Sequence, residues 1–232
     1  MSKHCLVIGV GPGLGLGCVR RFADSGYKVT MIARHAGRLE SWTNEIDAAT
    51  GYACDVADIE AYKATLNRIT EEHGEPDVVV YNAAKAVGGR FDEVAIEDFE
   101  FSFRINTTAL LVTAQILAPA MVARGQGALI VTGNTGSLRG SPSYIGWSPA
   151  KAAQRILSEG LARDLGPKGV HVAYIVVDAV IDMPFARKRR PNVAEEEFAK
   201  PYELAETVYT TAHQPRSAWS FFVELRPFCE TW

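Results

Sequence analysis

Residues 4–17, HCLVIGVGPGLGLG, join a short apolar run to a series of glycines that leads into a helical pattern. The apolar run at 4–10 is typical of a buried strand, and the apolar spacing at 14–25 predicts an amphipathic helix. Glycines in such a strand-to-helix turn let backbone N–H groups approach a pyrophosphate at the helix N-terminus. The glycines predicted to bind a dinucleotide in this way are Gly9, Gly11, Gly13 and Gly15.

The same alternation of strands and helices continues along the chain. Strand-like segments lie at 27–33, 51–56, 77–81, 128–133, 170–177 and 217–227, and helical patterns lie at 36–48, 58–73, 97–123 and 148–165. This order of short apolar strands predicts a mostly parallel, doubly wound sheet with helices on both faces. We therefore expect an α/β fold with three layers (helices, sheet, helices) that forms a single domain over 1–232.

Composition and charge exclude several classes of protein. The 232 residues carry 24 basic and 27 acidic side chains, a net charge of −3 that disfavours a general nucleic-acid binder. No uninterrupted apolar run approaches the roughly 18 residues of a membrane span, and the N-terminal apolar stretch is too short for a secretory signal. The four cysteines are scattered without metal-ligand spacing. We therefore expect a cytoplasmic protein with reduced thiols, no metal site and no membrane association.

The end of the second strand indicates which dinucleotide is bound. An enzyme that prefers NAD usually places Asp or Glu there, against the ribose 2′-hydroxyl. The residues present at 33–38 are ARHAGR, with no acid. Arg34, helped by Arg38, can instead pair with a 2′-phosphate through charge-assisted hydrogen bonds, although Arg38 is equally consistent with a solvated helix residue. The pattern favours NADP(H) over NAD(H).

Three further segments, each following a strand or lying on a helix, match the motifs of a known family. They are Cys54-Asp55-Val56, Tyr81-Asn82-Ala83-Ala84 and Ile105-Asn106-Thr107. Together with the glycine turn they make the chain resemble the short-chain dehydrogenase/reductase family over nearly its whole length. The resemblance implies a single Rossmann-fold domain in which Asp55 and Val56 edge the adenine ring and Asn82 and Ala83 contact the cofactor. It also implies that Asn106 serves a water-linked proton relay.

The catalytic segment departs from the family pattern. The family uses a Tyr four residues before a Lys, and here Trp147 stands four residues before Lys151. The resemblance implies that Lys151 holds the nicotinamide ribose, but an indole is a donor only and cannot replace the phenol as acid and base. For the family's Ser, which polarises the carbonyl, a count of thirteen residues back from Trp147 gives Asn134. Alignment on the preceding strand gives Thr135, which we prefer because it keeps a hydroxyl.

Three explanations of the missing phenol stay open. Tyr144, seven residues before Lys151, is a candidate proton donor, although Ser148-Pro149 resembles a helix start that would leave Tyr144 in a loop. A relay through Asn106, Lys151 and water is the second explanation. The third is loss of carbonyl reduction, which leaves a dinucleotide-binding protein or a non-redox enzyme (lyase, isomerase or cyclase) that reuses the cleft. The branch of the family that the chain resembles is a divergent one lacking the usual Tyr.

The segment after the sixth strand also departs from the family. The family's Pro-Gly is missing, and Ile181 is the residue whose backbone is placed to meet the nicotinamide carboxamide. A basic cluster then gives way to an acidic one over 184–201, which is consistent with a solvated loop or with a mobile substrate lid. The family resemblance implies a homodimer or homotetramer. The function expected is hydride transfer between NADP(H) and a carbonyl or alcohol of a small organic molecule.

Overall fold

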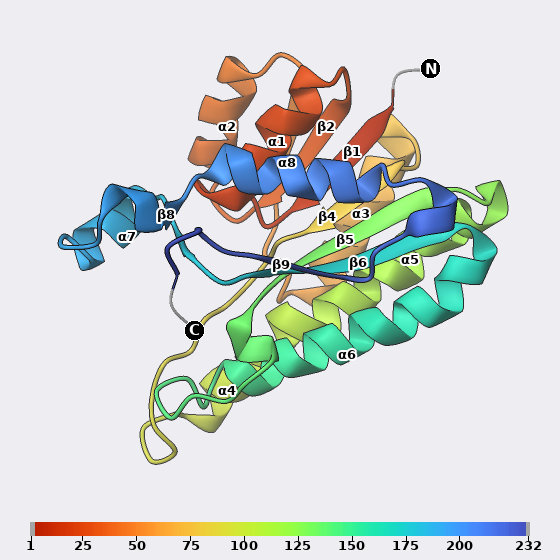
Figure 1. Ribbon diagram of the computed structural model, residues 1–232. Helices are drawn as coiled ribbons and strands as arrows, with labels where there is room; N and C mark the ends of the chain where they lie inside the picture. The colour runs from red at the N-terminus through yellow and green to blue at the C-terminus, as the bar shows by residue number, and fades with distance from the viewer. Residues whose placement is uncertain (1–2, 231–232) are drawn as a thin grey trace.

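Most strands of the computed structural model, which describes residues 3–230, line up in one parallel sheet (Figure 1). The outermost residues of the expected domain, 1–2 and 231–232, lie outside the described part. Within residues 3–230 seven strands form the order β3-β2-β1-β4-β5-β6-β9. Their bounds are β1 His4–Ile8, β2 Lys28–Ala33, β3 Ala49–Ala53, β4 Val78–Tyr81, β5 Gly127–Asn134, β6 Val170–Val177 and β9 Phe222–Leu225. The α/β doubly wound fold is confirmed.

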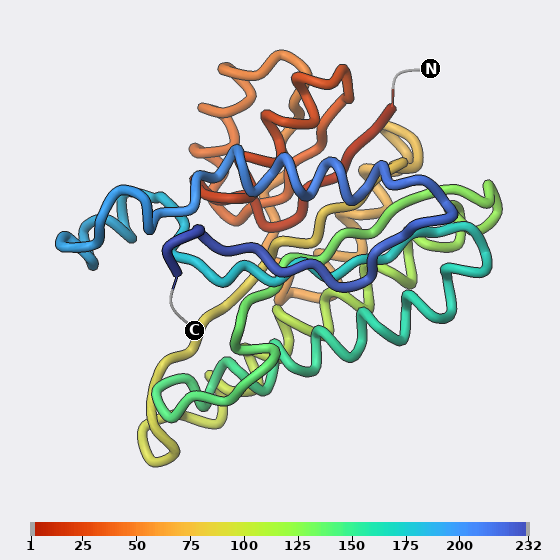
Figure 2. Tube along the Cα trace, viewed as in Figure 1, coloured from red at the N-terminus to blue at the C-terminus, as the bar shows by residue number. Residues whose placement is uncertain are grey.

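Helices cover both faces of this sheet, as Figures 1 and 2 show. One layer holds α1 (Leu14–Asp24), α2 (Ala36–Glu45) and α8 (Pro201–Ala212), and the other holds α3 (Ile59–His73), α5 (Ala109–Arg124) and α6 (Ser148–Leu165). Alternate residues of β1 enter the two cores, so that Cys5 and Val7 face one layer while Leu6 and Ile8 face the other. Burial on both faces explains why the strands are continuously apolar.

The main differences from the expected elements lie in the middle and near the end of the chain. The helix expected at 97–123 is divided into α4 (Ile96–Phe103), a π-helical turn (Arg104–Thr108) and α5. The expected lid forms α7 (Pro184–Arg189) and β8 (Phe198–Ala199), which pairs with β7 (Val180–Ile181). Helix α8 was not predicted, although Leu204, Ala205 and Val208 have the apolar spacing of a buried helix face.

The helical segment Ile96–Arg124 is long and apolar enough to cross a membrane by length and composition alone. Half of its most apolar window is buried inside the protein, where α5 contacts α3, α6 and the sheet. A core helix that is surrounded by other elements has the same composition as a membrane span, because lipid and protein interior are both apolar. The segment is a buried core helix of the α/β domain.

The carboxyl ends of β1 and β4 define the place where the cleft opens. These two strands are neighbours in the sheet, but the chain leaves them toward opposite faces, a topological switch point at which ligands bind in open α/β sheets. Gly9 follows β1 with a φ of +83°, and a Cβ built on it would lie 2.3 Å from the Cα of Ala83. Only glycine fits this close approach of the two strand ends.

Two helical glycines provide a matched test of how α8 is held. A Cβ on Gly17 of α1 would lie 2.5 Å from the carbonyl oxygen of Pro201, whereas one on Gly160 of α6 meets nothing within 4 Å. We expect Gly160→Ala to stabilise the protein by about 0.5–1 kcal/mol through helix propensity. Gly17→Ala should instead destabilise it by about 1–3 kcal/mol, since α8 must move. Urea unfolding measures both, and equal shifts would contradict the close α1–α8 contact.

Candidate active site

A first cleft lies over the ends of β1, β2 and β4. Its lining residues are Gly9, Val10, Gly11, Ile32, Ala33, Arg34, His35, Arg38, Trp42, Cys54, Asp55, Val56, Asn82, Ala83, Ala84 and Ile105. The structure therefore brings together most residues that the sequence assigned to the cofactor. Gly13 and Gly15 are not among them. Their side-chain space is filled by packing, because a Cβ on Gly13 would lie 2.5 Å from the sulfur of Met183 and one on Gly15 would lie 2.9 Å from the Cα of Val10.

Positive charge gathers at one end of this cleft. Arg34, His35 and Arg38 line it together, and the ion pairs described within residues 3–230 include none to Arg34 or Arg38. The acid in the lining is Asp55, whose carboxylate accepts a hydrogen bond from the backbone N–H of Ala57 at 3.0 Å. Asp55 is thus engaged in its own turn, and both arginines are available to an anion. His35, which lies between the two arginines in the sequence, also lines the cleft and had been given no role from the sequence.

A second cleft continues from the first over the ends of β5 and β6. Its lining residues are Leu14, Asn82, Ala84, Thr132, Gly133, Asn134, Tyr144, Trp147, Lys151, Val177, Ala179, Val180, Ile181, Met183, Phe185, Ala186, Arg189 and Arg190. Asn82 and Ala84 line both clefts, so the two form one continuous site. In the joint between them, Asn82 donates from Nδ2 to the Gly9 carbonyl at 2.8 Å and accepts at Oδ1 from the Thr132 hydroxyl at 2.9 Å.

Lys151 lies at the base of the second cleft with only 3% of its surface exposed. Its Nζ donates to the carbonyl oxygen of Thr132 at 3.1 Å and to Oε1 of Gln154 at 2.7 Å. Both partners are neutral, so nothing offsets the loss of water around the ammonium. Burial accordingly lowers the pKa of Lys151 to about 7. The lysine therefore changes its charge near neutral pH.

Gln154 links Lys151 directly to Asn106. Its Nε2 donates at 2.7 Å to the carbonyl oxygen of Asn106, which lies in the π-helical turn. The Asn106 amide is itself fixed, since its Nδ2 donates to the carbonyl oxygens of Ser102 at 2.8 Å and Lys85 at 3.0 Å. Asn106 is fully buried and lines neither cleft. The Gln154 amide thus occupies the link for which a water was expected, and sequence reasoning missed it because its partner is 48 residues away.

Trp147 and Asn134 present unpaired polar atoms beside Lys151. Nε1 of Trp147 and Oδ1 of Asn134 are buried and have no hydrogen-bond partner among the described residues. Both side chains line the second cleft. Buried polar groups are normally hydrogen-bonded, so each of these two atoms has an unmet hydrogen-bonding capacity in a side chain that lines the second cleft. Trp147 precedes α6 as its N-cap, one residue earlier than the expected Ser148.

The structure places Thr135 outside the lining of the second cleft. Strand β5 ends at Asn134, and Thr135 begins a 3₁₀ turn over Thr135–Ser137, where its carbonyl accepts from Leu138 and Arg139. Thr135 is absent from the residues that line the second cleft within 3–230, whereas Asn134 is present. The physical reason is that the strand continues one residue further than the alignment assumed. This brings the Asn134 amide to the cleft and carries the next side chain into the turn.

Tyr144 is the tyrosine that the structure brings to the second cleft. It lies in the loop before α6, is 44% exposed, and its ring meets that of Trp147 edge-on at 5.7 Å. Two other tyrosines near the site are buried and engaged. The Tyr81 hydroxyl donates to the carbonyl of Ile105 at 2.5 Å, and the Tyr174 hydroxyl donates to Oε1 of Gln154 at 3.3 Å. Burial raises the pKa of both phenols.

Comparison with known proteins identifies the family. The family model described as short chain dehydrogenase matches residues 3–193. The chain belongs to the short-chain dehydrogenase family. An L-xylulose reductase of Mesocricetus auratus is 32% identical over 172 residues, which are 74% of this chain and 69% of the relative. The fold and the relatives make this short-chain dehydrogenase an NAD(P)-dependent oxidoreductase.

Solved structures of other short-chain dehydrogenases superpose on nearly the whole chain. One from Rhodopseudomonas palustris has 28% identity and a TM-score of 0.83, covering 97% of this chain and 99% of that one. The closed form of a serine dehydrogenase complexed with NADP+ has 25% identity and a TM-score of 0.89, covering 99% and 97%. The chain therefore shares the fold of solved short-chain dehydrogenases. Within that fold, Trp147 occupies the position four residues before Lys151.

The buried lysine predicts how stability depends on pH. Below pH 7 folded and unfolded chains both carry the Lys151 charge, and the folded state bears its full desolvation cost. Above pH 7 the folded state releases the proton while the unfolded lysine keeps it to about 10.5, so that cost declines. Between pH 7 and 9 the wild type should gain about 2–3 kcal/mol relative to Lys151→Met in urea unfolding. Lys168→Met removes an exposed lysine and keeps Lys151, so its stability should follow that of the wild type between pH 7 and 9. If the stability of Lys151→Met also changed in parallel with the wild type, the buried charge would be contradicted.

Proposed function

We propose that this protein is an NADP(H)-dependent reductase of a carbonyl group in a small organic molecule, or the dehydrogenase of the corresponding alcohol. It would belong to a divergent branch of the family that lacks the usual catalytic Tyr. One observation carries the proposal. Asn82 and Ala84 line both clefts, so a basic dinucleotide cleft opens into one that holds Lys151, Tyr144 and unpaired polar atoms. The metal-ligating side chains of residues 3–230 form no group of three.

The lining of the first cleft supports NADP as the cofactor. The glycine turn admits backbone close to the ligand, and Asp55 and Val56 edge the position of the adenine ring. Arg34 and Arg38, with His35, would bind the 2′-phosphate, since one guanidinium group can donate two parallel hydrogen bonds to phosphate oxygens. Lys151 holds the ribose hydroxyls of the nicotinamide half, and Ile181 offers its backbone to the carboxamide. When bound, the nicotinamide supplies or accepts a hydride.

In the second cleft, different side chains would bind the substrate oxygen and deliver the proton. The Trp147 indole N–H, which has no other partner, donates to the substrate oxygen and stabilises the negative charge that develops there. The Asn134 side chain would donate from its Nδ2 to the same oxygen, the role expected for Thr135. Tyr144 gives its hydroxyl proton to that oxygen, and solvent replaces the proton because the ring is exposed. Asn106 acts at a distance, through the Gln154 amide that fixes Lys151.

Three further features belong to the proposal. Residues 184–201 act as a substrate lid, because α7 contributes lining residues to the second cleft. The protein forms a homodimer or homotetramer through the α5 and α6 layer, where Leu111 and Ile156 are exposed apolar side chains. It works in a reducing compartment such as the cytoplasm, as its three buried free cysteines suggest.

Cofactor titration followed by a substrate panel tests the function. NADPH fluorescence should increase on binding, and NADPH should be oxidised by at least one carbonyl compound of a panel that includes L-xylulose. Failure of the protein to bind either NADPH or NADH would overturn the proposal. Tight NADPH binding without turnover across the panel would favour a dinucleotide-binding protein or a non-redox enzyme.

Removal of one arginine tests the choice of cofactor. We expect Arg34→Ala to weaken NADPH binding by about 10-fold or more, since a charge-assisted hydrogen bond contributes roughly 1.5–3 kcal/mol. NADH, which has no 2′-phosphate, should bind as before. Arg163→Ala, which removes a 78% exposed arginine of α6, is the control and should leave both dissociation constants unchanged. An equal loss for NADPH and NADH would show that Arg34 does not select the phosphate.

Removal of one hydroxyl tests the proton donor. Tyr144→Phe should lower turnover by about 10²-fold, the usual scale for loss of a general acid, with little change in NADPH affinity. Tyr202→Phe is the matched control, because Tyr202 is also a half-exposed tyrosine (45%) but lies on α8, away from both clefts. Unchanged turnover in Tyr144→Phe would remove Tyr144 from the mechanism. Trp147→Tyr, which restores the family's phenol, should then show whether the rest of the site supports reduction.

A further inference from the structure

The charge lining the second cleft is of one sign. Its charged lining residues within the described chain are Lys151, Arg189 and Arg190, and none is an acid. Lys151 lies at the base, next to the expected ribose. Arg189 and Arg190 come from the end of α7 and the residue after it, so they lie at a different part of the cleft wall. The cleft therefore has a cationic wall that the proposed hydride and proton transfers do not use.

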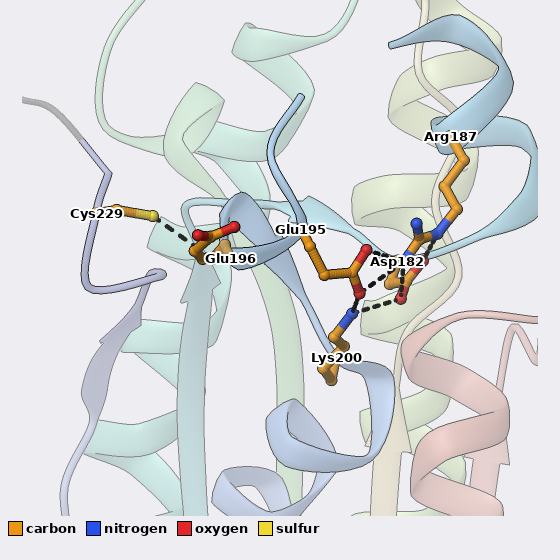
Figure 3. A network of polar contacts seen from close by, with 6 residues as sticks. All are labelled: Asp182, Arg187, Glu195, Glu196, Lys200 and Cys229. Atoms are coloured by element: carbon orange, nitrogen blue, oxygen red, sulfur yellow. Dashed lines mark hydrogen bonds and ion pairs between the residues drawn. The ribbon is translucent and has the colours of Figure 1, made fainter. Parts of the chain in front are cut away.

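Two acids that contact α7 and the segment after it, Asp182 and Glu195, are already paired with other cations. Arg187 and Lys200 both bind Asp182, and both also bind Glu195, in the network drawn in Figure 3. Two carboxylates and two cations make this network neutral, and these contacts lower the pKa of Asp182. Figure 3 shows Arg187 directed at Asp182. Arg187 of α7 is thus held in this network, and the two carboxylates of the network are already paired.

Arg189 and Arg190 lack such partners. The ion pairs and hydrogen bonds described for residues 3–230 contain no carboxylate bound to either side chain. The Arg189 guanidinium lies 5.4 Å from the centroid of the Phe185 ring, and that ring also lines the cleft. Stacking on an aromatic ring leaves the edge of a guanidinium free to bind an oxyanion with two parallel hydrogen bonds.

We propose that Arg189 and Arg190 form an oxyanion subsite for the substrate. The substrate is then a small carbonyl compound, or its alcohol, with a carboxylate or phosphate group at the end away from the reacting carbon. This inference rests on the proposed function, because it assigns the substrate class of the same cleft. Trp147 and Tyr144 would meet the carbonyl oxygen while the two arginines hold the anionic end, so both ends of the molecule are fixed.

Paired substrates with and without an anionic group test the subsite. The pairs are 4-oxobutanoate with its methyl ester, for a carboxylate, and glyceraldehyde 3-phosphate with glyceraldehyde, for a phosphate. We expect kcat/KM with NADPH to favour the anionic member of at least one pair by about 10-fold or more. In Arg189→Ala/Arg190→Ala this preference should disappear. Lys188→Ala removes one positive charge from an α7 residue outside the cleft lining and should keep the preference. Equal kcat/KM values within both pairs in the wild type would overturn the inference.

A binding measurement separates this inference from the proposed function. Succinate and its dimethyl ester, neither of which can be reduced here, are titrated into the NADPH complex by calorimetry. Tighter binding of succinate in the wild type and in Lys188→Ala, but not in the double variant, supports the subsite even where no carbonyl compound is turned over. Equal binding of the two compounds overturns the subsite while NADPH oxidation still stands. A double variant that loses NADPH affinity would show that the arginines bind the cofactor instead, which also overturns the inference.

Discussion

The side-chain amide of Asn82 ties together the strand ends on which both clefts depend. It joins the Gly9 carbonyl after β1 to the Thr132 hydroxyl of β5, and the Thr132 carbonyl in turn accepts from Lys151. Gln154 extends the same connection to the π-helical turn. A displacement of any one member would shift the glycine turn and the lysine relative to each other. The dinucleotide cleft and the reaction cleft are therefore positioned by a single chain of neutral hydrogen bonds.

The missing phenol changes the electrostatics around that chain. With no acidic or phenolic partner in contact, the Lys151 ammonium is surrounded by a carbonyl and an amide, and burial lowers its pKa to about 7. The indole at 147 offers a hydrogen bond to a substrate oxygen but holds its proton, so stabilisation of charge and delivery of the proton fall to different side chains. Under the proposed function, the lysine would chiefly position the cofactor, and the exposed Tyr144 would be the acid in contact with solvent.

Much of this could be read from the sequence, and the exceptions have physical reasons. The strands were predictable because burial on both faces makes them continuously apolar, and most of the cofactor cleft because its residues directly follow strands β1–β4. Asn134, and not the preferred Thr135, lines the second cleft, since one residue more or less at the end of a strand turns a side chain away. Gln154 and the cationic wall at Arg189 depend on contacts between distant segments, which no local pattern records.

The Gln154 amide has a consequence for proton traffic in the interior. A water molecule between Lys151 and the Asn106 carbonyl could rotate and exchange protons with its neighbours, whereas an amide keeps its oxygen toward the lysine and its nitrogen toward the carbonyl. The Gln154 amide therefore does not pass protons between Lys151 and the Asn106 carbonyl. Under the proposed function, protons would then be exchanged with solvent through the second cleft. A substrate bound in this cleft would limit the solvent access on which its own turnover depends.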